Sequence, residues 1–296
     1  MNQNLLADIQ RQMDTFSKGQ KLIANYIIDH YEKAAYMTAS KLGITVGVSE
    51  STVVRFASEL GYEGYPQLQK ALQELIRNRL TSVQRMEIAE EKMQSSDILK
   101  KVLNMDSDRI KRTLEEISPE EFEKAINTIN AARKIYIIGI RSSASLASFM
   151  SFYFNHIFDN SCQVNTSSSS EMYEQIFRID SSDVLITLSF PRYSKQTVKA
   201  AHCAISKGAK VIAITDSNES PIAKLADITL LARSDMASFV DSLVAPLSLI
   251  NALIVALGMT RHDIISASYA ELEKIWEEYH VYEKTVPSEC EADEEN

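Results

Sequence analysis

The sequence predicts two folded parts, an all-α helix-turn-helix domain followed by an α/β three-layer sandwich with a parallel sheet. Three observations predict this fold class. From Leu5 to about Arg79, apolar residues recur only at helical spacing. After residue 134, short runs of Val, Ile and Leu alternate with helix-length stretches, which is typical of a parallel sheet covered on both faces. Between the two parts, residues 81–118 are charged and helix-prone with few apolar positions, so we expect a helical connector.

A sharp turn between two helices is predicted at Gly47. Glycine supplies the positive-φ position that such a turn needs. In the helix that follows, Val53 and Phe56 lie on one face with Val48 and Leu60. The opposite face carries short hydroxylated side chains and one guanidinium, namely Ser49, Ser51, Thr52, Arg55 and Ser58.

This outer face suits the major groove of DNA. Hydroxyls reach phosphates or base edges, and an arginine pairs with guanine through two hydrogen bonds. With Thr38 and Lys41 from the preceding helix, these residues are the predicted contacts to double-stranded operator DNA. The same corner also occurs in helical hairpins that bind nothing. Because Lys and Arg barely outnumber Asp and Glu over residues 1–80, a monomer would bind DNA weakly, and we expect a dimer.

The composition of the whole chain limits the function classes. Its 296 residues are 45% hydrophobic with a formal charge of −9, which suits two globular domains and excludes an all-over basic coat. We expect residues 281–296 to form an acidic disordered tail. The three cysteines have spacings that match neither a zinc site nor a disulfide framework, so we expect no metal and no cofactor.

No membrane or export segment is predicted. The chain begins without a basic segment leading into an apolar run, so we expect no secretory signal. Together with the spacing of the three cysteines, this favours a protein of the reducing cytoplasm. The longest apolar stretch runs from Phe239 to Met259 and is interrupted by polar residues and a proline, namely Asp241, Ser242, Pro246, Ser248 and Asn251. We expect a buried or interface helix there. This helix and a later one around Leu272, Ile275 and Trp276 are candidates for subunit contact, or simply core.

The elements of the second domain follow from local signals. Ser118 and Pro119 are a helix start, with serine as the cap and proline at the first helical position, and the helix should reach about Ala132. Strands are expected at 134–139, around 162–164, and at 183–188, 210–214 and 227–231.

A ligand site is expected at the carboxyl ends of these strands, where helix N-termini present free amides. The loops at 139–144 and 189–194 each open a helix and together supply hydroxyls and two arginines, which favours an anion. The serines could instead merely cap their helices. Two neighbouring guanidinium groups would repel each other unless an anion, or a protein carboxylate such as Glu171 or Asp216, lay between them. A dianionic small molecule is therefore our hypothesis, and the serine run at 167–170 is either a further donor set or a loop.

Several sequence motifs resemble those of a known protein family. Residues 15–75, with Ser17–Lys21, Ile23–Ile27 and above all Gly47–Phe56, resemble the helix-turn-helix domain of the RpiR family of bacterial transcription regulators. Residues 120–260 resemble the SIS (sugar isomerase) domain that this family carries. The matching positions are Gly139, Ser143, Ser189, Ser194, Gly208–Ala209 and Ser220–Ala223.

The resemblance implies a regulator that binds operator DNA as a dimer or tetramer and responds to a phosphorylated sugar. The expected domains are 1–80, the connector 81–118, a SIS-like domain over 119–280 and the tail. The family usually has serine at Pro191 and glycine at Arg192 and Arg141. These departures predict an altered effector, smaller or more strongly anionic, or a pocket that has lost its ligand. The predicted effector-binding residues are Arg141, Ser142, Ser143, Ser189, Arg192, Tyr193, Ser194 and Glu171.

Two other function classes are considered. SIS domains also occur as aldose-ketose isomerases, for which the acid-base candidates are Glu171, His156, His202 and His262. The DNA-reading corner and the altered phosphate loop point away from an enzyme. A dimeric scaffold that binds no DNA is the third class.

Overall fold

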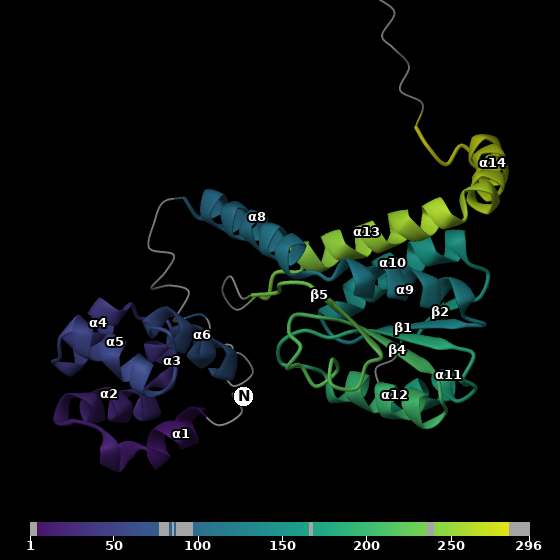
Figure 1. Cartoon of the computed structure of the whole chain (residues 1–296). Helices are drawn as coiled ribbons and strands as arrows, with labels where there is room; N and C mark the ends of the chain where they lie inside the picture. Colours follow the sequence, from purple (N-terminus) through teal and green to yellow (C-terminus); the bar gives the residue numbers. More distant parts are fainter. Residues whose placement is uncertain are drawn as a thin grey trace, which may run out of the picture.

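The computed structural model describes residues 5–76, 83–84, 86, 97–165, 168–235 and 240–283 (Figure 1). The N-terminal part is entirely helical over its described residues, as predicted. Its elements are α1 (Leu5–Arg11), the 3₁₀ turn η1 (Met13–Thr15), α2 (Lys18–Asp29), α3 (Tyr31–Ala34), α4 (Ala39–Val46), α5 (Glu50–Glu59) and α6 (Tyr65–Ile76).

One apolar core holds these helices together. Ile23 and Ile27 of α2, Phe56 of α5 and Leu72 of α6 are each fully buried in it. The rings of Phe16 and Phe56 meet edge-on with centroids 5.1 Å apart. Because α5 contributes only its inner face to this core, its outer face is left on the surface.

The second part contains a five-stranded sheet in which every pairing is parallel, with the order β2-β1-β3-β4-β5. The strands are β1 (Ile135–Gly139), β2 (Ser161–Gln163), β3 (Val184–Leu188), β4 (Lys210–Thr215) and β5 (Ile228–Leu231). All five predicted strands are confirmed within one or two residues. Gly139 pairs with Leu188, so β1 and β3 end at the same level.

Helices cover both faces of the sheet, which confirms the three-layer sandwich (Figure 1). Ile135 and Ile137 face one core, and Tyr136 and Ile138 face the other. The first core is closed by α9 (Pro119–Ala131), α10 (Ser143–Ile157) and α13 (Val244–Thr260). The second is closed by α11 (Ser169–Ile176) and α12 (Lys195–Ser206). The predicted start of α9 is confirmed, since the Ser118 hydroxyl accepts from the Glu121 amide at 3.2 Å.

The apolar stretch predicted from Phe239 to Met259 is a helix, α13, but it begins only at Val244. Leu249 and Leu253 are buried in the core, while Val255 and Met259 are 60% and 76% exposed. The last helix, α14 (His262–Glu278), has no buried residue. No single helix among the described residues is long and apolar enough to cross a membrane; α13 and α14 meet that test only jointly, with a bend of 98° between them.

The predicted connector is only partly a linker. Its described helix, α8 (Ile98–Glu116), packs against α13 and buries Arg109 and Thr113. The sequence region 81–118 was expected to suit a connector better than a core, but α8 also makes polar contacts with the segment before α13, through Asp106 to Ser242 and Thr113 to Arg233. The predicted tail falls largely on residues 284–296, which lie outside the described residues.

Candidate functional site

The turn between α4 and α5 is built by two glycines. Gly47 lies in the left-handed region with φ 75° and ψ 34°, as predicted, and is exposed. The Val48 amide donates to the Gly43 carbonyl at 2.8 Å, which closes the end of α4. A Cβ on Gly43 would lie 2.8 Å from the Val48 carbonyl oxygen, so only glycine lets α4 approach the turn this closely. Gly43 was missed from the sequence, where it reads as an ordinary helical residue.

The N-terminus of α5 carries a cluster of three hydroxyls. Ser49 caps the helix by accepting from the Thr52 amide at 3.3 Å. Its Oγ also lies 2.9 Å from the Ser51 hydroxyl and 2.8 Å from the Thr52 hydroxyl. Farther along, Nε of Arg55 donates to the Ser51 carbonyl at 3.3 Å, which holds the guanidinium along the exposed face of α5. Donors, acceptors and a positive charge are therefore gathered at the positive end of the helix dipole.

The predicted DNA contacts share one accessible surface. Thr38, Lys41, Ser49, Ser51, Arg55 and Ser58 are all exposed. Thr52 is half-buried, because its methyl group faces α2, where a Cβ on Gly19 would lie 3.4 Å from it. Thr38 also caps α4 by accepting from the Lys41 amide at 3.2 Å.

A second site lies between the carboxyl ends of β1 and β3. The chain runs from β1 to β2 on one side and returns to β3 on the other, so the order of the strands reverses at this point. The helices that follow the two strands, α10 and α12, pack on opposite faces of the sheet. The loops after β1 and β3 therefore diverge, and a crevice opens between them.

Gly139 brings the first loop close to its helix. A Cβ on this residue would lie 2.3 Å from the Ser143 carbonyl oxygen, which no side chain tolerates. The contact places the first turn of α10 directly over the end of β1 and buries Ser143.

The crevice contains a small pocket of about 60 Å³. It is lined by Ile140, Arg141, Ser142, Ser143, Leu188, Ser189, Phe190, Pro191, Arg192, Ser194 and Asp241. A pocket of this size suits a compact polar group.

Ser189 lines this pocket and carries a buried hydroxyl. Its main chain is fixed by β4, since its amide donates to the Ile214 carbonyl and its carbonyl accepts from the Thr215 hydroxyl. The residue is 2% exposed, and its Oγ has no hydrogen-bond partner among the described residues. A buried hydroxyl without a partner is costly, and a bound group that reaches it removes that cost.

Both arginines of the pocket have unusual backbones. Arg141 has φ 60° and Arg192 has φ 62°, in the left-handed region that glycine adopts without strain. These are the two positions where the resembling family usually has glycine. Each left-handed arginine is strained by about 1–2 kcal/mol relative to an ordinary backbone. The fold thus keeps these two exposed arginines at the pocket although their backbones would prefer a negative φ.

The structure separates the remaining predicted effector residues. Ser194 lines the pocket and also caps α12, accepting from the Gln196 amide at 3.2 Å. Ser142 lines the pocket and makes no side-chain cap bond. Tyr193 lies outside the lining, and its hydroxyl donates to Asp216 at 3.0 Å. Glu171 also lies outside it, since α11 follows β2, on the side of β1 away from β3. Of the serine run, Ser168 caps α11, while Ser167 lies outside the described residues.

Asp241 is the lining residue that the sequence did not suggest. Glu171 and Asp216 were named as the carboxylates that could lie between the two arginines in place of a bound anion, but neither lines the pocket. The carboxylate that does comes from the segment before α13. The available signal was a charged residue inside the most apolar stretch of the chain.

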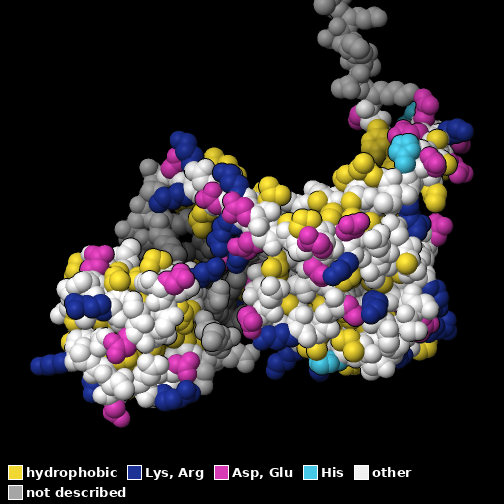
Figure 2. Space-filling view, viewed as in Figure 1, with side chains coloured by type: hydrophobic (Ala, Val, Ile, Leu, Met, Phe, Trp, Pro, Cys, Tyr) yellow, Lys and Arg dark blue, Asp and Glu magenta, His cyan; other side chains and the backbone are white. Residues whose placement is uncertain are grey.

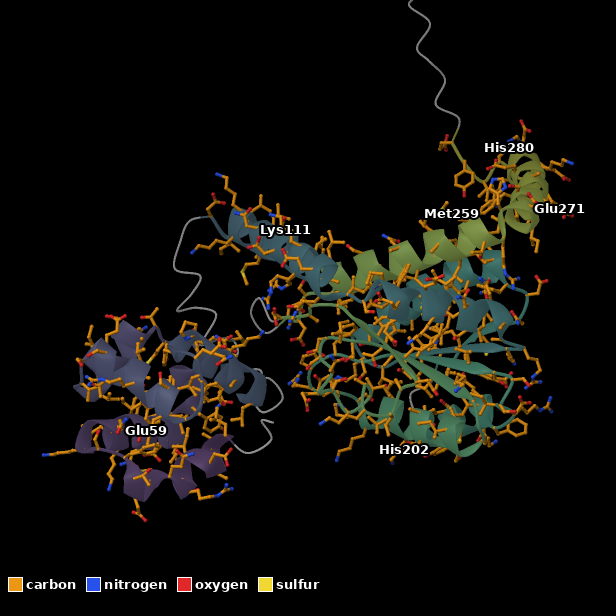
Figure 3. The ribbon with its side chains drawn as sticks, viewed as in Figure 1. Glu59, Lys111, His202, Met259, Glu271 and His280 are labelled. Atoms are coloured by element: carbon orange, nitrogen blue, oxygen red, sulfur yellow. The ribbon has the colours of Figure 1, made fainter. Side chains whose placement is uncertain are left out.

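The acid-base candidates for catalysis do not meet at the pocket. His156 lies 2.8 Å from the Tyr269 hydroxyl, between α10 and α14. His202 lies on the outer surface of α12 (Figure 3). His262 begins α14 and is exposed.

Comparisons with known proteins agree with this architecture. Residues 3–79 match the helix-turn-helix domain of the rpiR family, and residues 128–256 match the SIS domain. An uncharacterised HTH-type transcriptional regulator of Caldanaerobacter subterraneus subsp. tengcongensis is 23% identical, covering 88% of this chain and 92% of the relative. The HTH-type transcriptional regulator HexR of Pseudomonas aeruginosa is 25% identical, covering 87% of this chain and 89% of HexR.

A solved structure shares the fold over nearly the whole chain. The NanR protein of Vibrio vulnificus, complexed with ManNAc-6P, superposes with a TM-score of 0.57 at 21% identity, covering 93% of this chain and 99% of that chain. The sugar isomerase domain of an RpiR transcription factor from Sphaerobacter thermophilus has a TM-score of 0.58 at 24% identity, covering 60% and 99%. Two matching domains in this order, with relatives named as regulators over most of the chain, identify the protein as a helix-turn-helix transcriptional regulator of the RpiR family with a C-terminal SIS domain.

Proposed function

We propose that this regulator reads operator DNA with α5 and senses a small anion, the phosphate end of a phosphorylated sugar or a related compound, at the ends of β1 and β3. The observation that carries the proposal is the pocket itself. Two arginines in left-handed conformations and Ser189, whose buried hydroxyl has no hydrogen-bond partner among the described residues, line a pocket of about 60 Å³. Arginine forms strong, charge-assisted hydrogen bonds with phosphate oxygens, and hydroxyl groups can add further donors.

The altered loop fits an effector held chiefly by side chains. Pro191 has no amide hydrogen, so the second loop offers one backbone donor fewer than a loop with serine there. The two guanidinium groups replace that donor with charge. In this proposal the anionic group occupies the pocket and the sugar lies towards its open side. The structural relative with ManNAc-6P supports a phosphorylated sugar as the ligand class.

On the DNA side, the proposed contacts are Thr38, Lys41, Ser49, Ser51, Thr52, Arg55 and Ser58. We propose that the protein acts as a homodimer or homotetramer, because a single domain with so little excess positive charge gains little affinity from phosphates. Exposed apolar residues on α13 and α14, among them Val255, Met259, Ile264 and Ile275, are the proposed subunit contact. Hydrophobic side chains also break the polar surface around these helices (Figure 2).

The remaining parts of the proposal follow from these two sites. The protein works in the cytoplasm, where its DNA is, with a reading domain over 1–80, a connector over 81–118 and a sensing domain over 119–280. Among the described residues that line the pocket, Asp241 is the one carboxylate and there is no histidine, which supports a sensor over an isomerase for the SIS domain.

DNA reading is tested by gel shift with the DNA upstream of the chain's own gene. Arg55→Ala should abolish the shifted band while circular dichroism stays unchanged. Arg11→Ala is the matched control, since Arg11 is exposed on α1 and pairs with its helix neighbour Asp8 at 3.3 Å. An Arg55→Ala protein that shifts the DNA as well as wild type would contradict the proposed surface.

Anion sensing is tested by titration calorimetry with inorganic phosphate, glucose 6-phosphate and ManNAc-6P. Arg141→Ala, Arg192→Ala and Ser189→Ala should each weaken the binding of any ligand that wild type binds, by roughly tenfold or more for the arginines. Arg178→Ala, an exposed arginine before β3 at the opposite edge of the sheet, should not. Unchanged binding in all three pocket variants would remove the site.

A further inference from the structure

The segment between β5 and α13 connects the pocket to α8. Its described residues are Ala232–Asp235 and Val240–Leu243, here called the β5–α13 segment. The two halves are tied together, since the Ser234 hydroxyl donates to the Ser242 carbonyl at 2.9 Å and the Ser242 amide donates to the Asp235 carbonyl at 3.4 Å. Ser234 is fully buried and Ser242 is 8% exposed. The segment is thus a fixed part of the domain over these residues.

One side of the segment is bonded to the buried face of α8. Oδ1 of Asp106 accepts from the Ser242 hydroxyl at 2.7 Å and from the Arg109 guanidinium at 2.8 Å. Arg109 is 3% exposed, so this ion pair is shielded from solvent and depends on its neighbours. The Ser242 hydroxyl and the buried Arg109 guanidinium therefore donate to the same carboxylate oxygen of Asp106.

Further contacts extend this attachment along α8. The Arg233 amide donates to the Thr113 hydroxyl at 2.9 Å, and the Arg233 guanidinium pairs with Glu116. Asp235 pairs with Arg112 at 3.5 Å. Movement of the segment therefore acts on α8 through several side chains, and not through one bond.

The other side of the segment reaches the anion pocket. Asp241 lines it together with Arg141 and Arg192. Asp241 and Ser242 are consecutive residues, so one planar peptide unit joins them and couples their positions. A residue that lines the pocket and a residue whose hydroxyl bonds to α8 are therefore direct neighbours in the chain.

We propose that Asp241 reports the occupancy of the pocket to α8. The inference rests on the proposed anion sensing and adds how it is transmitted. In a pocket of about 60 Å³, a bound phosphate group and the Asp241 carboxylate compete for the same two arginines and repel each other. Binding displaces Asp241, and this displacement moves Ser242 relative to Asp106 and Arg109. As a result, the position of α8 on the SIS domain changes. The ligand thus acts on the helix that leads to the DNA-reading domain by favouring one of two arrangements of a connected network.

The test uses the full-length protein with inorganic phosphate and glucose 6-phosphate as probes. Calorimetry measures their affinity, and hydrogen–deuterium exchange of peptides from residues 98–116 measures the response of α8. In Asp241→Asn, the repulsion is lost, so phosphate should bind about five- to tenfold more tightly, and the phosphate-induced change in α8 exchange should disappear. In Ser242→Ala, phosphate affinity should stay within about twofold of wild type while the α8 response is lost.

Asp159→Asn is the matched control. Asp159 is an exposed carboxylate before β2, at the edge of the sheet away from the pocket, so its neutralisation changes the net charge equally and should change neither measurement. Weaker phosphate binding in Asp241→Asn would overturn the inference. So would a phosphate-induced change in α8 exchange as large as that of wild type in Asp241→Asn or in Ser242→Ala. If wild type binds neither probe, the proposed anion sensing fails instead. Without ligand, Asp241→Asn should still shift α8 exchange relative to Asp159→Asn, and no difference there would also count against the relay.

Discussion

The helix-turn-helix corner and the strand-end loops both need the left-handed backbone, and they meet that need with different residues. Gly47 takes φ 75° at the corner, where its side of the chain is open and nothing is within 4 Å of an added Cβ. Arg141 and Arg192 take φ 60° and 62° at the pocket. At the corner only the direction of the chain matters, because α5 carries the functional groups. At the pocket the side chains themselves are required, and the fold tolerates the strain of holding them.

The largest loss of stability is expected at Gly139, where a side chain would collide with the backbone, rather than at Gly47, where glycine is favoured by its positive φ. Gly139→Ala places a methyl group 2.3 Å from the Ser143 carbonyl oxygen, so α10 must shift and the free energy of unfolding should fall by roughly 3 kcal/mol or more. Gly47→Ala should lose only about 1 kcal/mol, from its backbone angle alone. Urea denaturation followed by circular dichroism measures both. Equal losses would show that the two glycines serve the same purpose.

The next effect concerns the support of the helix-turn-helix corner. The buried Tyr65 hydroxyl donates to the Met37 carbonyl at 2.9 Å and fixes the chain before α4. Burial raises the pKa of Tyr65 from 10.0 to about 12. The unfolded chain therefore loses this proton first, and stability that is fully present below pH 10 should decline by about 2–3 kcal/mol as the pH rises through 12.

Alkaline unfolding followed by circular dichroism checks this expectation. Tyr65→Phe should be less stable at pH 7, because its hydrogen bond is gone, yet lose less additional stability between pH 10 and pH 12. A variant with the same alkaline decline as wild type would assign the decline to other groups.

A smaller effect distinguishes strain from packing at the arginines. Arg192→Val puts a β-branched side chain at φ 62° and should destabilise by about 1–2 kcal/mol. Arg192→Gly should stay within about 1 kcal/mol of wild type, because relief of strain offsets the greater entropy of the unfolded chain. Thermal unfolding without ligand compares them. If glycine were as destabilising as valine, the arginine side chain would itself support the fold.

The smallest effect compares two serines that precede helices. Ser49 caps α5, so Ser49→Ala should lower stability by about 1 kcal/mol. Ser142 makes no cap bond with α10, so Ser142→Ala should leave stability unchanged within about 0.5 kcal/mol and weaken anion binding instead. Paired denaturation and calorimetry of the two variants check this. A clear loss of stability in Ser142→Ala would return that serine to a structural role.

Local patterns were sufficient for much of the molecule. The left-handed Gly47, the outward hydroxyls of α5 and the five strands all depend on residues close in sequence, where spacing decides the outcome. The meeting of the two arginine loops also followed, because adjacent parallel strands end at one edge.

Long-range polar contacts could not be predicted in the same way. Asp241 lies about fifty residues from the nearer arginine loop, and no periodicity relates it to the pocket. The packing of α8 on the rest of the SIS domain was not predicted, because the spacing of apolar residues does not reveal an interface formed by polar side chains. Here those side chains are Arg109, Asp106 and Thr113. Whether a serine caps or faces a ligand depends on the backbone angles before the helix, which differ between Ser142 and Ser194.

The attachment of α8 changes where the chain can be cut. A shortened protein that starts at residue 119, at the boundary that composition suggests, would strip Ser242 and Arg233 of their α8 partners and bare part of α13 to water. One that starts near residue 97 keeps them. The shortest SIS-domain fragment that keeps these contacts therefore includes the whole of Ile98–Glu116. This fragment is the one to use for crystallisation, ligand screening or fusion to another DNA-binding domain.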